Sequence, residues 1–158
     1  MKKILFALTL FLLIVSVNEK IYSHCQIPCG IYDDKLRIEQ IKEHITTIEK
    51  SMKLIKELSA EGEKNYNQIV RWVLNKEEHA DKLTEIVTYY FLAQRLKPVL
   101  NMNDKGYKEL TEKLILLHEM TVYAMKAKQT TELSHAAKLK ELTDKFSKAY
   151  FKEQEHKH

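Results

Sequence analysis

Glycine and proline are scarce in this sequence: its 158 residues include 3 glycines and 2 prolines. β-Sandwiches and β-barrels use both residues at their many tight turns, so the scarcity argues against those folds and favours an all-helical one. Apolar residues are not lacking, since 44% of the chain is hydrophobic, which is too apolar for a disordered chain. The length is that of one globular domain.

A large excess of one charge is also missing. The net charge is +4, and setting aside the three lysines and one glutamate of residues 1–23 leaves 23 basic and 21 acidic side chains. No cluster of arginines with interleaved aromatic residues occurs either. Nucleic acid is therefore not an expected partner.

The first 23 residues have the pattern of a secretory signal peptide. Two lysines near the start precede an uncharged run from Ile4 to Val17, and a polar segment follows it. This run is shorter than the ~20 residues that span a bilayer, although an uncleaved membrane anchor is the alternative. Ser23 is small enough for the last position before a cut, so we expect cleavage to leave His24 as the mature N-terminus. The protein would then be periplasmic or secreted, with no membrane contact after leader cleavage.

Apolar residues recur at alternating three- and four-residue spacing in four stretches, which is the pattern of helices with one buried face. Long helices joined by short turns predict antiparallel neighbours. We therefore expect an all-α fold, an antiparallel up-down four-helix bundle over residues 33–158, with helices at about 33–60, at 63–96, from the turn at 103–106 to about 127, and at 131–151.

The same spacing predicts which residues face inward. These are Ile38, Ile41, Ile45, Ile48, Met52 and Ile55 in the first helix, Ile69, Val73, Ala80, Leu83, Val87 and Tyr90 in the second, Leu110, Leu114, Leu117 and Ala124 in the third, and Leu133, Ala137, Leu142, Phe146 and Ala149 in the fourth. Five histidines have no partner at ligand spacing and are expected on helix surfaces or in the tail: His44, His118, His135, His156 and His158.

The segment 24–32, just ahead of the first helix, holds both cysteines of the chain, Cys25 and Cys29. A disulfide between them is one interpretation, but it would close a very short loop and stabilise the fold little. A metal site is the other. After cleavage, His24 offers an α-amine and an imidazole, Cys25 an amide and a thiolate, and Cys29 a second thiolate. A tetragonal set of nitrogen and sulfur donors favours nickel or copper over zinc.

The motif His-Cys-x-x-Pro-Cys-Gly-x-Tyr at 24–32 resembles the nickel-binding hook of the nickel superoxide dismutases. Weaker similarity continues through Arg37-Ile38-Glu39, Lys76-Glu77-Glu78-His79-Ala80 and Tyr90-Phe91. The resemblance implies a homohexamer of four-helix bundles with one nickel ion per subunit, held by His24, Cys25 and Cys29. It also implies that the nickel alternates between Ni(III) and Ni(II) while superoxide is converted to dioxygen and hydrogen peroxide.

The resemblance assigns further residues to the surroundings of the metal. Tyr32 matches the tyrosine over the vacant axial face, and Tyr90 matches a second pocket tyrosine; packing alone is the alternative for both. Glu39 matches the glutamate that holds the axial imidazole. His79 stands where the family has an arginine that binds this glutamate, which makes the charge at that position dependent on pH.

Two other functions fit the same residues. One is a secreted nickel- or copper-binding protein without turnover, and the other is a helical interaction module closed by a disulfide. The carrier would hold metal without dismutase activity, whereas the module would hold neither metal nor free thiol. Metal content and free thiols of the mature protein separate them from an enzyme.

Overall fold

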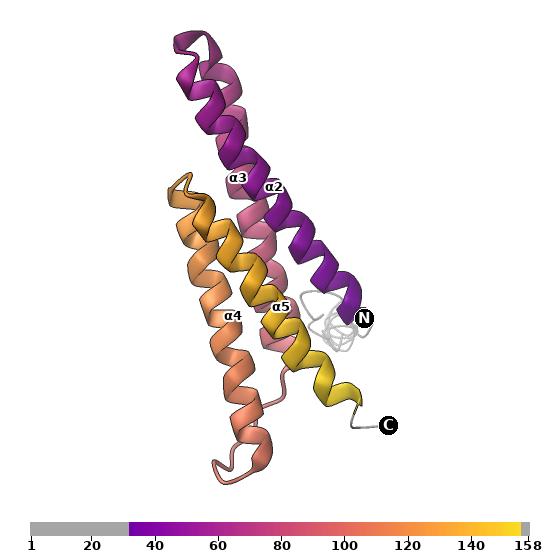
Figure 1. Ribbon diagram of the computed structural model, residues 1–158. Coiled ribbons are helices and arrows are strands. Elements are labelled where there is room, and N and C mark those ends of the chain that lie inside the picture. Colours follow the sequence, from indigo (N-terminus) through magenta and orange to yellow (C-terminus); the bar gives the residue numbers. More distant parts are fainter. Residues whose placement is uncertain (1–31, 156–158) are drawn as a thin grey trace, which may run out of the picture.

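The computed structural model describes residues 32–155, apart from the side chains of residues 63 and 153–155. Its helices form two antiparallel hairpins that pack side by side (Figure 1). The first hairpin consists of α2 (Asp34–Ala60), the 3₁₀ turn η1 (Glu63–Asn65), α3 (Tyr66–Glu85) and the π-helical segment η2 (Ile86–Arg95); the second consists of α4 (Lys105–Gln129) and α5 (Leu133–Glu155).

Each helix packs on the two helices next to it in the bundle. Besides the contacts within the hairpins, α2 packs on α5 and α3 packs on α4. This closed ring confirms the predicted four-helix bundle for the described part of the chain. The two hairpins are displaced along the bundle axis, so the turn between α2 and α3 extends beyond the turn between α4 and α5 (Figure 1). None of the described helices is both long enough and apolar enough to cross a membrane.

Short side chains and one glycine set the ends of the helices. The carboxylate of Asp33 accepts a hydrogen bond from the Leu36 amide at 2.9 Å, so Asp33 is the N-cap of α2. Gly62 adopts φ +87° just after α2 and allows the chain to turn into the second helix. Asp104 caps α4 by accepting a hydrogen bond from the Gly106 amide at 2.7 Å.

The predicted inward faces are confirmed for α2 and partly wrong for α4 and α5. All six apolar positions expected on α2 are buried, and with Ser51 they form its buried face. Leu114, however, is 37% exposed, and Ala137 is exposed. The apolar run at 114–117 is compatible with two helical faces, and the face that includes Leu116 and Leu117 is the one that packs inward.

Lys76 is an unexpected member of the buried set, with 3% of its surface exposed. Its ammonium donates hydrogen bonds to the carbonyl oxygens of Lys128 at 2.6 Å and Thr130 at 2.8 Å. Carbonyl groups at a helix end have no partner within the helix, so α3 supplies the cap for the C-terminal end of α4. Burial lowers the pKa of Lys76.

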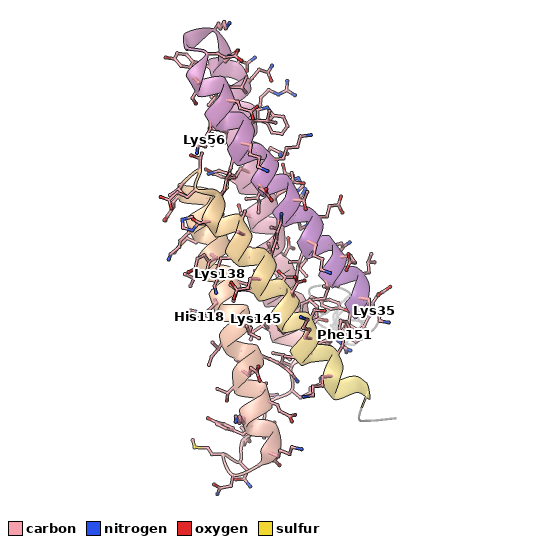
Figure 2. The ribbon with its side chains drawn as sticks, in the orientation of Figure 1. Lys35, Lys56, His118, Lys138, Lys145 and Phe151 are labelled. Atoms are coloured by element: carbon pink, nitrogen blue, oxygen red, sulfur yellow. The ribbon has the colours of Figure 1, made fainter. Side chains whose placement is uncertain are left out.

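Charged and polar side chains lie on the outer faces of the helices. Lys35 and Lys56 on α2 and His118 on α4 are exposed (Figure 2). The prediction that His118 lies on a helix surface is therefore confirmed. His135 is half-buried beside Tyr123, and its Nε2 lies 3.5 Å from the Glu132 carboxylate.

Candidate active site

The predicted metal ligands, His24, Cys25 and Cys29, lie outside the described residues. Tyr32, Glu39, His79 and Tyr90 lie within them. Tyr32 comes two residues before α2 begins and therefore connects the predicted metal-binding segment to the bundle. Among the described residues, no group of three or more histidine, cysteine, aspartate and glutamate side chains could hold a metal ion.

The π-helical segment η2 determines which side chains face Tyr32. In an α-helix, two residues five positions apart differ by about 140° in direction. A π-helix pairs residue i with residue i+5 instead, as the Leu96 amide does with the Phe91 carbonyl at 3.0 Å. Tyr90 and Arg95, five positions apart, therefore reach the same carboxylate, that of Asp34 in the first turn of α2.

Among the described residues, three side chains donate hydrogen bonds to Asp34. Arg95 binds it through both prongs of its guanidinium, Nε to Oδ1 at 2.8 Å and Nη2 to Oδ2 at 2.7 Å. The Tyr90 hydroxyl donates to Oδ1 at 2.7 Å and the Tyr150 hydroxyl to Oδ2 at 2.8 Å. The carboxylate thus joins the start of α2 to η2 and to the last part of α5. We call these four residues, Asp34, Tyr90, Arg95 and Tyr150, the Asp34 cluster.

Burial and charge shift the ionisation of the cluster. Burial and the hydrogen bond to the Asp34 carboxylate raise the pKa of Tyr150 to about 12. The same two causes raise the pKa of Tyr90 further still. The hydrogen bonds to Asp34 also raise the pKa of Arg95 above its already high value. Both tyrosines are therefore neutral hydrogen-bond donors at any physiological pH.

The ring of Tyr32 lies between two members of this cluster. The centre of the Arg95 guanidinium is 4.3 Å from the Tyr32 ring centroid, a cation–π contact. The Tyr90 ring meets Tyr32 edge-on, with centroids 5.9 Å apart and an interplanar angle of 69°. The Tyr32 hydroxyl contacts Gln94 Oε1 at 3.4 Å, which is long for a hydroxyl donor. These contacts hold the ring in place. Because Tyr32 is 42% exposed, its ring is still accessible.

A groove of about 280 Å³ opens between α2 and the second helix, beside Tyr90. Arg37 lines it and lies 5.2 Å from the Tyr90 ring centroid. Its Nη1 donates to Gln40 at 2.8 Å, whereas its Nε is buried without a hydrogen-bond partner in the described part of the chain. The remaining lining residues are Gln40, Glu43, His44, Lys82, Glu85, Ile86 and Tyr89.

The structure does not bring Glu39 and His79 together. Glu39 is exposed on α2, and its carboxylate binds Lys42 at 2.9 Å. His79 pairs instead with His44, with the two Nδ1 atoms 3.0 Å apart. Glu39 and His79 therefore have different partners in the described part of the chain. His44, expected on the surface, is half-buried in this pair.

The histidine pair has room for a single bridging proton. At 3.0 Å, one Nδ1 must donate and the other accept, so a second proton between them would break the hydrogen bond. Burial lowers the pKa of His44, and the nearby His79 and Lys82 lower it further, against a smaller opposing effect of Glu43. The imidazole of His44 is therefore neutral near pH 7.

A comparison with protein families matches residues 19–154 to the nickel-containing superoxide dismutase family. That range extends from ahead of the segment 24–32 to the last turn of α5. The chain belongs to this family. Membership of the nickel-containing superoxide dismutases indicates superoxide as substrate and nickel as cofactor in general terms. In the other two comparisons, no curated protein and no solved structure matches the chain.

Three residues that surround the site were not assigned to it from the sequence: Asp34, Arg95 and His44. Asp34 follows the N-cap, and an acidic residue in the first turn of a helix is too common to indicate a site. Arg95 could be placed beside Tyr90 only by recognising the π-helix. His44 and His79 are 35 positions apart, so their pairing depends on the register between α2 and α3.

Proposed function

We propose that this protein is an exported nickel superoxide dismutase that converts superoxide to dioxygen and hydrogen peroxide. The observation that carries the proposal is the family match, because its range includes a segment rich in nitrogen and sulfur donors directly ahead of Tyr32. The Asp34 cluster supports it, because it fixes the residue that connects this segment to the bundle.

The donors fit one nickel ion per subunit. His24 would supply its α-amine and imidazole, Cys25 its amide nitrogen and thiolate, and Cys29 a second thiolate. Thiolates and an anionic amide are strong electron donors that suit tetragonal nickel or copper better than zinc. When bound, the nickel supplies a one-electron acceptor and donor that passes between Ni(III) and Ni(II).

Tyr32 would act on the substrate rather than on the metal. Its hydroxyl can donate a hydrogen bond to superoxide and order water near the site. Formation of hydrogen peroxide consumes two protons, and ordered water is a route for them from solvent. The ring is accessible, and its neighbours η2 and α2 limit the directions of approach.

We propose that Glu39 and His79 would each support the imidazole of His24, by separate routes. Glu39 has an exposed carboxylate that can accept a hydrogen bond from an imidazole. His79 would act through its pair with His44, which ties α3 to the part of α2 beside the groove. Neither residue needs to contact the other in this arrangement.

We also propose that the protein assembles as a homohexamer and is exported. A homohexamer is supported by apolar side chains left exposed on α3, of which Tyr66 is 60%, Val70 55% and Leu74 61% exposed. Export to the periplasm or the exterior is supported by the signal-peptide pattern of residues 1–23. A single cut before His24 would then both complete export and free the amine.

The position of the cut gives the sharpest test. One variant would mature at His24, and the other would keep a single alanine in front of it, which turns the α-amine into an amide nitrogen. Their circular dichroism should match, because α2 begins ten residues later, at Asp34. We expect the extended form to lose nearly all dismutase activity in the presence of nickel. Equal activity of the two forms would rule out the amine as a ligand, and nickel binding without turnover in the first form would indicate a carrier.

A further inference from the structure

The placement of the Tyr32 ring depends on two side chains that share one anchor. The face of the ring meets Arg95 and its edge meets Tyr90. Both of these side chains bind the carboxylate of Asp34. Within residues 32–155, the hydroxyl of Tyr32 itself has only a long contact, to Gln94. The orientation of the ring is therefore set through Asp34 more than through the hydroxyl of Tyr32.

We infer that Asp34 is a positioning residue for superoxide dismutation, which acts on Tyr32 through Arg95 and Tyr90. The inference rests on the proposed function, since it concerns the residue that would contact superoxide. Asp34 does not itself contact substrate in this account. It holds in register the three elements, α2, η2 and α5, that determine where the Tyr32 hydroxyl lies.

Asp34 also has an electrostatic effect that opposes its positioning effect. Its carboxylate compensates the charge of Arg95, which lies directly over Tyr32. Superoxide is an anion, so an uncompensated guanidinium at this place would attract it and speed its capture. Removal of the Asp34 charge should therefore raise the rate if electrostatics dominates, and lower it if the position of Tyr32 dominates.

Three variants separate these effects. Asp34→Asn removes the charge and the two-pronged binding of Arg95, and leaves the guanidinium positive. Arg95→Lys keeps a positive charge but loses the planar fork and its contact with the Tyr32 ring. Asp81→Asn is the matched control, because Asp81 binds Lys128 at 2.7 Å in an exposed ion pair between α3 and α4.

Two measurements are made on each full-length mature variant. The first is the NMR spectrum of the nickel-free protein with ¹³C-labelled tyrosine rings, which reports the surroundings of Tyr32 whether or not metal is bound. The second is the rate constant for superoxide decay by the nickel-loaded protein after pulse radiolysis, at low and high ionic strength. A role in stability alone would leave both readouts unchanged at temperatures where the variant is folded.

We expect Asp34→Asn and Arg95→Lys both to shift the Tyr32 ring signals and to lower the rate constant roughly tenfold or more. Asp81→Asn should change neither. If Asp34→Asn had a higher rate constant than wild type at low ionic strength while Arg95→Lys kept the wild-type value, electrostatics and not positioning would explain the effect of Asp34. That result would overturn the inference. Unchanged Tyr32 signals, or shifted signals with an unchanged rate, would overturn it too. An inactive nickel-loaded wild type would instead overturn the proposed function.

Discussion

Replacement of Lys76 by methionine tests whether one buried ammonium holds the two hairpins together. The ammonium makes two hydrogen bonds, to the carbonyl oxygens of Lys128 and Thr130. Hydrogen bonds to a charged group contribute about 1.5–3 kcal/mol each, and removing the donor leaves both carbonyl groups without it. Methionine avoids the cost of burying the charge, which offsets part of this loss. We expect the free energy of unfolding to fall by about 2–4 kcal/mol.

The control is the same substitution at Lys128, whose ammonium lies in a partly exposed ion pair with Asp81. Such pairs contribute about 0–1 kcal/mol, so Lys128→Met should be nearly neutral. Urea denaturation followed by circular dichroism at 222 nm measures both variants under identical conditions. If Lys76→Met costs no more than Lys128→Met, the cap on α4 contributes nothing to stability and the reasoning from its hydrogen bonds is wrong.

Two further predictions concern the thiolates and the histidine pair. Cys25→Ser and Cys29→Ser should each abolish nickel binding and activity and leave the helical content nearly unchanged, because neither residue belongs to the bundle. Metal analysis and circular dichroism check this. A large loss of helix would favour a structural disulfide. The folded-state pKa of His44 is lowered, so below about pH 6.5 the unfolded chain binds more protons and stability is lost as pH falls. Thermal unfolding at pH 7.5 and 5.5 should show a smaller loss of stability for His44→Gln than for wild type, whereas the control His118→Gln, at an exposed site, should lose as much as wild type. Equal losses in all three proteins would show that His44 does not cause the pH dependence.

The bundle could be predicted because local signals decide it. The spacing of isoleucines on α2 indicated both the helix and its buried face. Leu114 shows the limit of this reasoning. A run of adjacent apolar residues satisfies more than one helical face, and only packing against α3 and α5 selects among them.

The surroundings of Tyr32 depend on the π-helical segment η2, and no sequence signal indicated that this segment is π-helical. The stretch 86–95 is rich in β-branched and aromatic residues but contains no glycine or proline to mark a change of helix type. Read as an α-helix, it turns Arg95 away from Tyr90. Read as a π-helix, it brings both to Asp34. The family resemblance identified Tyr32 and Tyr90, whereas their anchor could be found only from the structure.

The displacement of the two hairpins makes the bundle unequal in thickness along its length. Where α2 and α3 extend beyond the turn at the end of α4, neither α4 nor α5 runs alongside them (Figure 1). The fully buried residues of α3 begin at Lys76, so its first ten residues, 66–75, contribute none. Segments with few buried apolar contacts open at a lower free energy than the rest of a protein. Local unfolding should therefore start at this end of the molecule, while the Asp34 cluster, at the opposite end of α2, stays closed.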